Sequence, residues 1–529
     1  MSGRAGERRQ HPKGPRFLGS IERLLRTGCA PAAGMRPKDP ANDHSALEAL
    51  LPRPRGGASR LAVRARLCRG VLRSARFWLA LVLIPDWAGH AAMSQQIQQL
   101  PSTNTGAPAG YGPPPSYRPP PSSKPGGKIV PAGQLKFDPA DLPVLVRPRP
   151  DLDPLGVRFG SFLVFPELRI SEFYDDNILF SESNAQDDFI TEIAPRLRID
   201  SDWNEDLLSF EARAAIGRYA QHTNQNYEDY GTSLRGRFWV TDTSYFHHEF
   251  SYDRRHSDRD SPDDTTGVHP TEYDDLLNSA GFFQEFGRFT LRLDGAFRRL
   301  DYLNDEQITG GVVTPVDNSD RDRNQILGTA RVGYLIRQDI ETYVQASYGV
   351  IHYDTSPDDN GFQRDANTYN AIVGIAKDWN GIFETDIYVG YLAQTFDDPR
   401  FDTIDGIDFG GKFVWNVTRR TTFSALVGRR ISVTTLDNAA GSLVTEASIT
   451  VDYELRRDLL LYSNAKWREN DYSGIDRTDD TYEIGAGVNY FITRNFNVGA
   501  GYSYRQRNSN VPTAEYMRNL VMLNLDLRF

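Results

Sequence analysis

The sequence lacks the features that mark three common classes of protein. Only 2 of its 529 residues are cysteine, which excludes a scaffold held together by disulfides. No run approaches the roughly 18 consecutive apolar residues of a membrane-spanning helix, which excludes a helical membrane bundle. The formal net charge of −10 argues against nucleic-acid binding as the main activity. A soluble β protein and a membrane β-barrel remain, because a long chain can form one barrel whose apolar half is hidden by alternation.

Catalytic and metal-binding motifs are also lacking. There is no Gly-x-Ser-x-Gly elbow and no Walker-type phosphate loop. His247 and His248 are adjacent, so in a strand they would point to opposite faces and not share a metal. We therefore expect no enzyme, no catalytic or metal site and no cofactor. Carboxylate clusters in the loops could bind Ca²⁺, but solvated, repelling loops are the preferred interpretation; the clusters are Asp258, Asp260, Asp263 and Asp264, Asp358 and Asp359, and Asp397 and Asp398.

Residues 60–91 have the three parts of a secretory signal. Six arginines between Arg60 and Arg76 precede a short apolar run at 77–84, and small residues follow at 88–92. This order is typical of an exported protein, and we predict cleavage after Ala91. Both cysteines lie upstream of that point, so the mature chain would carry no thiols into an oxidising compartment.

Two further segments do not have the composition of a packed domain. Residues 1–59 are expected to be a non-native or disordered extension, with translation starting downstream of Met1. Residues 92–157 are rich in Gln and Pro, which favours an extended periplasmic tether. Prolines between Arg147 and Pro154 forbid a central strand there, so we expect an ordered entry segment or the edge of a plug.

From residue 158 to the C-terminus, apolar and polar residues alternate with a period of two. One face of the final segment consists only of apolar residues: Val521, Leu523, Leu525, Leu527 and Phe529. The other face carries Asn524, Asp526 and Arg528. The same pattern recurs at 289–298, 340–350, 383–391 and 496–505. Because successive strand residues point to opposite faces, this pattern predicts an all-β, transmembrane antiparallel β-barrel over residues 158–529.

Short and long connections alternate along this region. Tight joins are predicted near Asn204, Asp242, Gly287, Gln338, Asn380, Thr418, Arg457 and Arg494. Longer acidic stretches lie between them, for example at 175–188, 257–271, 304–323 and 354–365. Periplasmic turns and extracellular loops alternate in this way, and the count gives about 18 strands, with 16 as the alternative. Closure is required because hydrocarbon cannot satisfy a free sheet edge.

Aromatic residues near the strand ends are predicted to form girdles at the two membrane interfaces. The candidates are Tyr245, Phe246, Tyr334, Tyr343, Trp379, Trp415, Trp467 and Tyr490. Ordinary β-propensity is the alternative explanation for their presence.

The polar face is predicted to line the lumen, and it carries both signs of charge. Its members are Glu211, Arg213, Arg292, Asp294, Arg298, Arg331, Glu341, Glu384, Asp386, Lys412, Glu446, Lys466, Arg505, Asp526 and Arg528. In a barrel of this size the interior can hold an aqueous channel, and charged rings would tune which solutes pass. The sequence favours equally the alternative that these residues pair across neighbouring strands and fill the bore.

The opening of this region resembles the β-barrel porin 2 family of outer-membrane proteins. The resemblance rests on Arg147-Pro148-Arg149-Pro150, on residues 153–162 and 166–168, and on residues 172–179. It extends from residue 147 to the C-terminus, and the ending at Phe529 is similar to the signal recognised by the barrel-assembly machinery. The resemblance implies an envelope role near exopolysaccharide or capsule production in Gram-negative bacteria, and it supplies no catalytic residues.

These observations lead to two functional hypotheses. The first is a passive outer-membrane channel or conduit, linked to exopolysaccharide export. The second is a structural or surface-interaction barrel whose loops at 257–271 and 304–323 bind a glycan or protein. The expected partners are outer-membrane lipid and lipopolysaccharide, the barrel-assembly machinery and polysaccharide, and no nucleic acid.

Overall fold

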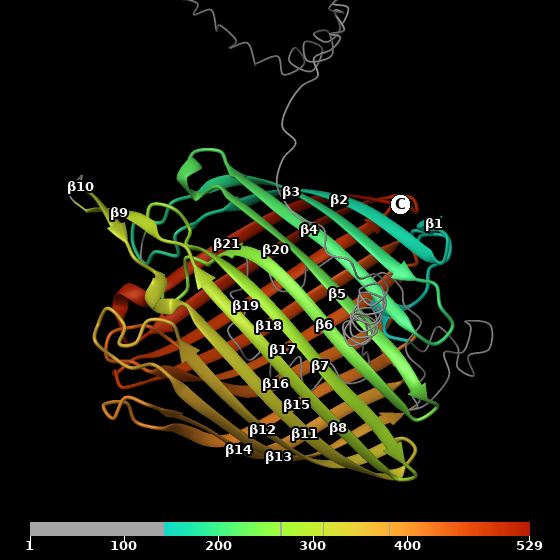
Figure 1. Ribbon diagram of the computed structural model, residues 1–529. Helices are drawn as coiled ribbons and strands as arrows, with labels where there is room; N and C mark the ends of the chain where they lie inside the picture. Colours follow the sequence, from blue (N-terminus) through green and yellow to red (C-terminus); the bar gives the residue numbers. More distant parts are fainter. Residues whose placement is uncertain (1–141, 265–266, 310–311, 380) are drawn as a thin grey trace, which may run out of the picture. The chain divides into compact units, whose positions relative to one another are not determined.

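The computed structural model describes residues 142–264, 267–309, 312–379 and 381–529 (Figure 1). The predicted extension, the signal and most of the predicted tether lie outside the described residues. Eighteen antiparallel strands close into one barrel, which confirms the predicted fold class and strand count. None of the helices in the described ranges is long and apolar enough to cross a membrane.

The barrel strands follow one another around the wall in chain order. They are β2 (Phe162–Asp175), β3 (Asp188–Ser201), β4 (Leu207–Tyr219), β5 (Tyr227–Thr241), β6 (Ser244–His256), β7 (Glu272–Phe286), β8 (Phe289–Tyr302), β11 (Arg323–Arg337), β12 (Ile340–Tyr353), β13 (Ala366–Trp379), β14 (Phe383–Phe396), β15 (Ile404–Thr418), β16 (Thr421–Val433), β17 (Gly441–Arg456), β18 (Leu459–Ser473), β19 (Thr478–Phe491), β20 (Phe496–Ser509) and β21 (Tyr516–Arg528). A short β1 (Val157–Phe159) forms a hairpin with β2, and β9 (Asp305–Thr309) pairs with β10 (Val312–Val316) in the loop after β8.

The wall is closed by a seam between its first and last long strands. β2 pairs with β3 on one side and with β21 on the other, and the register sets Arg169 opposite Asp526. The Arg169 Nε donates to Asp526 Oδ1 over 2.5 Å. Every long strand therefore has two neighbours, which is what a sheet surrounded by hydrocarbon requires.

The connections sort into short turns at one end of the barrel and longer loops at the other, except that the connection between β18 and β19 at the loop end is also short. All eight predicted joins fall at the short connections; the one near Asn380, itself outside the described residues, is bracketed by Trp379 and Phe383. The four longer loops named from the sequence are also confirmed. β2 begins and β21 ends at the short-turn end, where the chain enters and leaves the barrel.

The predicted girdle is partly wrong. Phe246, Trp379 and Trp415 point outward and are exposed, as expected for contact with lipid. Tyr245 and Tyr343 are instead buried on the inner face. Strand parity explains the first, since Tyr245 and its neighbour Phe246 must point to opposite faces. The Tyr343 ring lies over Gly374, where any Cβ atom would collide with it, and its hydroxyl donates to Asp386 over 2.7 Å.

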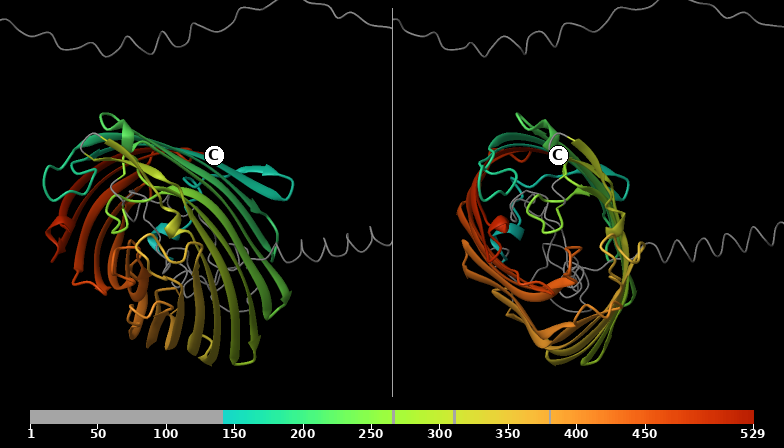
Figure 2. Two further views of the ribbon diagram at one scale, coloured as in Figure 1. Left: turned by 60° about the vertical axis from the view of Figure 1, so that its left-hand side comes forward. Right: turned by 90° about the vertical axis from the view of Figure 1, so that its left-hand side faces the viewer.

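The described end of the predicted tether lies on the inner wall at the short-turn end. A short 3₁₀ helix, η3 (Val144–Val146), buries Val144 against Leu460 and Phe491. The Val144 N–H donates to Thr422 Oγ1 over 2.8 Å, and the Arg147 guanidinium donates to Glu454 over 3.2 Å. Figure 2 shows this cyan segment against the inside of the barrel wall. Among the described residues no strand precedes β1, which agrees with the prediction that the prolines between Arg147 and Pro154 forbid one.

Candidate functional site

The charged residues predicted for the lumen lie on the face that the barrel encloses. Residues paired directly across two strands share a face, and the register links all ten of the principal candidates to one side. They are Glu211, Arg213, Arg292, Asp294, Arg298, Arg331, Glu341, Glu384, Asp386 and Arg505.

Most of these side chains pair with a neighbour along the wall. The pairs are Arg196–Glu211 (2.5 Å), Arg213–Asp253 (2.6 Å), Arg292–Asp294 (2.8 Å), Arg298–Asp275 (2.8 Å), Arg331–Glu341 (2.7 Å), Lys412–Glu384 (3.0 Å) and Arg505–Glu483 (3.0 Å). Five of these seven contacts join neighbouring strands, which is one of the two alternatives that the sequence left open; Arg292–Asp294 lies within β8, and Arg213–Asp253 joins β4 to β6. The paired charges form the wall that a solute inside the barrel would meet.

The loop between β6 and β7 folds into the barrel over its described residues, 257–264 and 267–271, and is called the constriction loop below. Its Asp260 carboxylate accepts from the Arg505 and Arg507 guanidinium groups, at 3.3 Å each, and from the Tyr516 hydroxyl at 3.0 Å. These partners belong to β20 and β21. The light-green segment inside the ring in Figure 2 is part of this loop.

A second anchor of the constriction loop lies on a different part of the wall. Asp263 accepts from Thr434 Oγ1 at 2.5 Å and from the Thr435 N–H at 2.9 Å, just after β16. Around the barrel, β6 is six strand positions from β20 in one direction and eight from β16 in the other. A loop held at β6, β20 and the end of β16 therefore crosses the interior near the loop end.

The far anchor is itself braced by three packed loops, 354–365, 397–403 and 434–440. The Arg364 guanidinium donates to the carbonyls of Thr434 (2.7 Å) and Ala439 (2.6 Å) and to the Asp358 carboxylate (2.5 Å). The rings of Phe362 and Phe401 stack beside it with centroids 4.9 Å apart. Arg364 thus fixes the peptide groups to which Asp263 binds.

Opposite charges meet where the constriction loop contacts the wall. Burial raises the pKa of the Asp260 carboxyl, but the Arg505 and Arg507 guanidinium groups outweigh burial and lower this pKa to about 2. Burial, together with the charge of Asp260, raises the pKa of the Asp258 carboxyl to about 7. Near neutral pH Asp260 is therefore firmly ionised, whereas Asp258 is close to its titration point.

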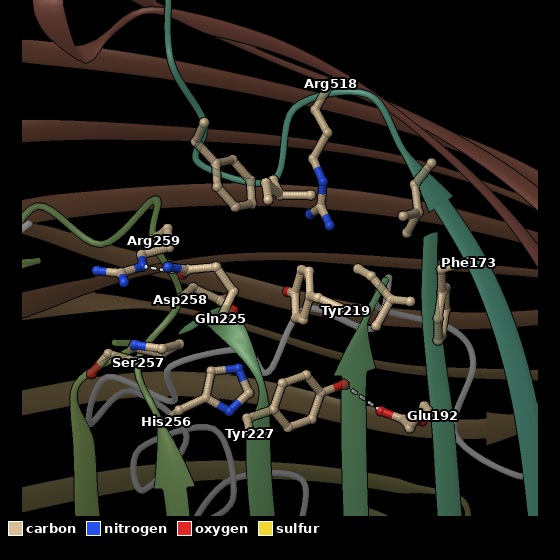
Figure 3. Close-up of a pocket in the computed structure, with 15 residues that line it drawn as sticks. Phe173, Glu192, Tyr219, Gln225, Tyr227, His256, Ser257, Asp258, Arg259 and Arg518 are labelled. Carbon is tan, nitrogen blue, oxygen red and sulfur yellow. Dashed lines mark hydrogen bonds between the residues drawn. The ribbon is translucent and has the colours of Figure 1, made fainter. Parts of the chain in front are cut away.

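A small cavity of about 50 Å³ lies behind the base of the constriction loop (Figure 3). Phe173 and Leu520 line one part of it, and Tyr227, His256 and Asp258 line another. The Tyr227 hydroxyl donates to Glu192 over 2.7 Å. Since one water needs about 10–15 Å³, the cavity has room for a few waters and is too small for a sugar.

The acidic loop clusters do not form a metal site in the described part of the chain. No group of three or more His, Cys, Asp or Glu side chains suitable for a metal occurs there. Asp260 and Asp263 are engaged as described above, and Asp264 pairs with Arg259 at 3.2 Å. The sequence marked these aspartates as a cluster, but it did not reveal that the loop folds inward to meet arginines more than 200 positions away.

The closed barrel, its polar inner face and its inward loop define an outer-membrane β-barrel of the porin class. The chain belongs to the family described as "Putative beta-barrel porin 2", whose model matches residues 149–529. This match confirms the resemblance found from the opening motif. No curated protein matches the sequence.

Among solved structures the chain is similar to outer-membrane proteins of Pseudomonas aeruginosa. The protein OpdK is 12% identical with a TM-score of 0.37, and the match covers 69% of this chain and 99% of that one. The corresponding values for OccK3 (OpdO) are 16%, 0.38, 72% and 97%. For OccK9 (OpdG) they are 13%, 0.39, 70% and 99%.

Proposed function

We propose that this protein is a passive outer-membrane channel for hydrophilic solutes, narrowed by the constriction loop. The observation that carries the proposal is that the loop is anchored at two places. Asp260 binds side chains of β20 and β21, and Asp263 binds Thr434, which follows β16. A loop that crosses a charged bore selects solutes by size and charge, as constrictions do in other channels. No enzymatic role is proposed.

The proposal includes the envelope setting implied by the resemblance. The barrel would lie in the outer membrane of a Gram-negative cell, inserted by the barrel-assembly machinery through Val521, Leu523, Leu525, Leu527 and Phe529, and surrounded by lipid and lipopolysaccharide. The solute would be a polysaccharide or its fragments, exported or recovered near an exopolysaccharide pathway. Deletion of the gene in its host should change the amount of cell-surface polysaccharide, measured chemically.

The channel itself is tested in planar lipid bilayers with the purified full-length protein. We expect stable single-channel conductance, and we expect Asp260→Asn to raise it, because a broken buried ion pair costs about 3–5 kcal/mol and the loop would leave the wall. Asp359→Asn, at an exposed carboxylate in another loop, is the matched control. A wild-type protein without conductance would refute the channel, and an unchanged Asp260→Asn conductance would refute the role of the loop.

A surface-interaction barrel is the second candidate, and one feature favours it. The β9–β10 hairpin projects from the loop end (Figure 1) and exposes Val312 and Val313. Exposed apolar residues on a projecting edge suit binding to a partner. If this second candidate is correct, removal of residues 305–316 should abolish binding of the glycan or protein partner and leave the conductance unchanged.

A further inference from the structure

Three cations on the inner wall cluster around the carboxylate of Glu446 beside the constriction. Arg430 on β16, Lys466 and Arg468 on β18, and Glu446 on β17 lie together on this face. Glu446 Oε2 is 3.7 Å from Arg430 Nη1 and 3.7 Å from Arg468 Nε. Both distances exceed hydrogen-bond length, unlike the tighter pairs elsewhere on the wall.

The hydrogen-bonding capacity of these cations is not used up by the described residues. Arg430 Nε, Arg430 Nη1 and Arg468 Nε are buried without a hydrogen-bond partner there. Lys466 makes no ion pair or hydrogen bond with any described residue. The next carboxylate, Glu483, is held at 3.0 Å by Arg505. Buried charged donors without partners are costly, so this arrangement is expected to be completed by an additional acceptor.

The cluster adjoins the constriction and remains within reach of the interior. Arg468 is near enough to Asp260 to contribute to the low pKa of that carboxyl, after the larger effects of burial, Arg505 and Arg507. The side chains of Glu446 and Arg468 are each about 30% exposed, at 29% and 30%. A solute that passes the constriction loop would meet these groups.

We propose that Arg430, Lys466 and Arg468 form an anion subsite that binds the carboxylate of an acidic saccharide. Arginine presents a planar fork that matches an oxyanion, and lysine adds a compact charge, which is the donor set that carboxylates and phosphates share. This inference rests on the proposed channel and names the class of solute it selects: oligosaccharides that carry uronate groups.

The test measures binding and block separately, so that the two proposals can fail independently. Calorimetry of the detergent-purified full-length protein measures binding of trigalacturonate, of the neutral maltotriose and of inorganic phosphate. Bilayer recordings measure block by the same three probes. The double variant Arg430→Gln with Arg468→Gln should weaken trigalacturonate binding and block by about tenfold or more, because it removes the charged hydrogen bonds that two guanidinium groups would donate to the carboxylate.

Arg254→Gln is the matched control, because Arg254 lies on the outer face of β6 in an ion pair of 2.6 Å with Asp274. We expect it to leave binding and block unchanged. The double variant Arg430→Lys with Arg468→Lys should restore part of the charge effect but not the full affinity. Heat-modifiable migration on gels verifies that each variant is folded.

The outcomes separate the possibilities. Equal affinity of wild type and double variant for trigalacturonate overturns the subsite, whether or not the protein conducts. Tight binding of phosphate without binding of trigalacturonate would show that the anion bound at the subsite does not come from an acidic saccharide. Binding of maltotriose as tight as that of trigalacturonate overturns the role of charge. A wild-type protein that binds trigalacturonate but does not conduct supports the subsite and refutes the channel.

Discussion

At the scale of single residues, the interior is organised by where each charge finds a partner. Asp260 is ionised because two guanidinium groups and a hydroxyl surround it. Asp258, two positions earlier, is buried without an ion pair to any described residue. The groups that act on it are Asp260 on its own loop, His256 on β6, Arg505 on β20 and Arg518 on β21. Neighbouring aspartates in one loop therefore respond oppositely to pH.

This difference predicts a pH dependence of the constriction loop. The pKa of Asp258 is higher in the docked loop than its ordinary value of 3.8. Its contribution to the stability of the docked loop is therefore lost as the pH rises from 3.8 through about 7. The pKa of Asp260 is lowered to about 2 in the docked loop. Its contribution to the stability of the docked loop therefore appears between about pH 2 and 3.8 and is fully present above pH 3.8. The docked loop should be most stable near pH 4, and it should loosen as the pH rises from there to about 7.

Protease accessibility of the constriction loop, followed from pH 4.5 to pH 8, measures this dependence. We expect cleavage to accelerate with pH in the wild type, and to be flat in Asp258→Asn, which keeps the shape but does not titrate. Cleavage that is fastest at pH 4.5, or an Asp258→Asn variant that retains the wild-type profile, would contradict the assignment of this titration to Asp258.

At the scale of elements, the strands were predictable and the inward loop was not. Alternation with a period of two depends only on local sequence, so the final segment from Val521 to Phe529 was placed correctly. The same alternation indicates that Tyr245 and Tyr343 point inward. The girdle prediction placed them on the outer face because it relied on their position near strand ends. The contact of Asp260 with Arg505 joins positions 245 apart and depends on barrel closure, which no local pattern encodes.

The entry segment is an element whose anchoring can be tested alone. Val144 has no exposed surface and packs on Leu460 and Phe491, so Val144→Asp would bury an unpaired charge and should release the segment. We expect thermolysin, which cleaves before apolar residues, to cut before Leu145 or Val146 much faster in this variant. Leu155→Asp, at a position that is 66% exposed in the same segment, should cut at the wild-type rate. Equal rates in both variants would show that η3 is not what holds the segment.

At the scale of the whole molecule, the barrel depends on one seam that joins the chain's ends. The seam is held near the short-turn end by Arg169–Asp526 and near the loop end by Arg518–Asp175, each at 2.5 Å. Both carboxylates are almost fully buried, and Asp526 also accepts from Asn497 Nδ2 over 2.7 Å. Closure thus places charge pairs where removal of a carboxylate takes a buried counter-charge away from the arginine across the seam.

The seam predicts a large and asymmetric effect of two similar substitutions. Asp526→Ala should destabilise the barrel by about 3–5 kcal/mol, because it removes the counter-charge that faces the largely buried Arg169 guanidinium across the seam. Asp202→Ala breaks an ion pair of similar length, 2.6 Å, with Arg158, but the two side chains are 46% and 60% exposed. Its cost should stay below about 1 kcal/mol, since solvent screens an exposed pair. Urea unfolding in lipid vesicles, followed by tryptophan fluorescence, measures both; equal destabilisation would mean that the β2–β21 seam is held by its backbone ladder and not by its charges.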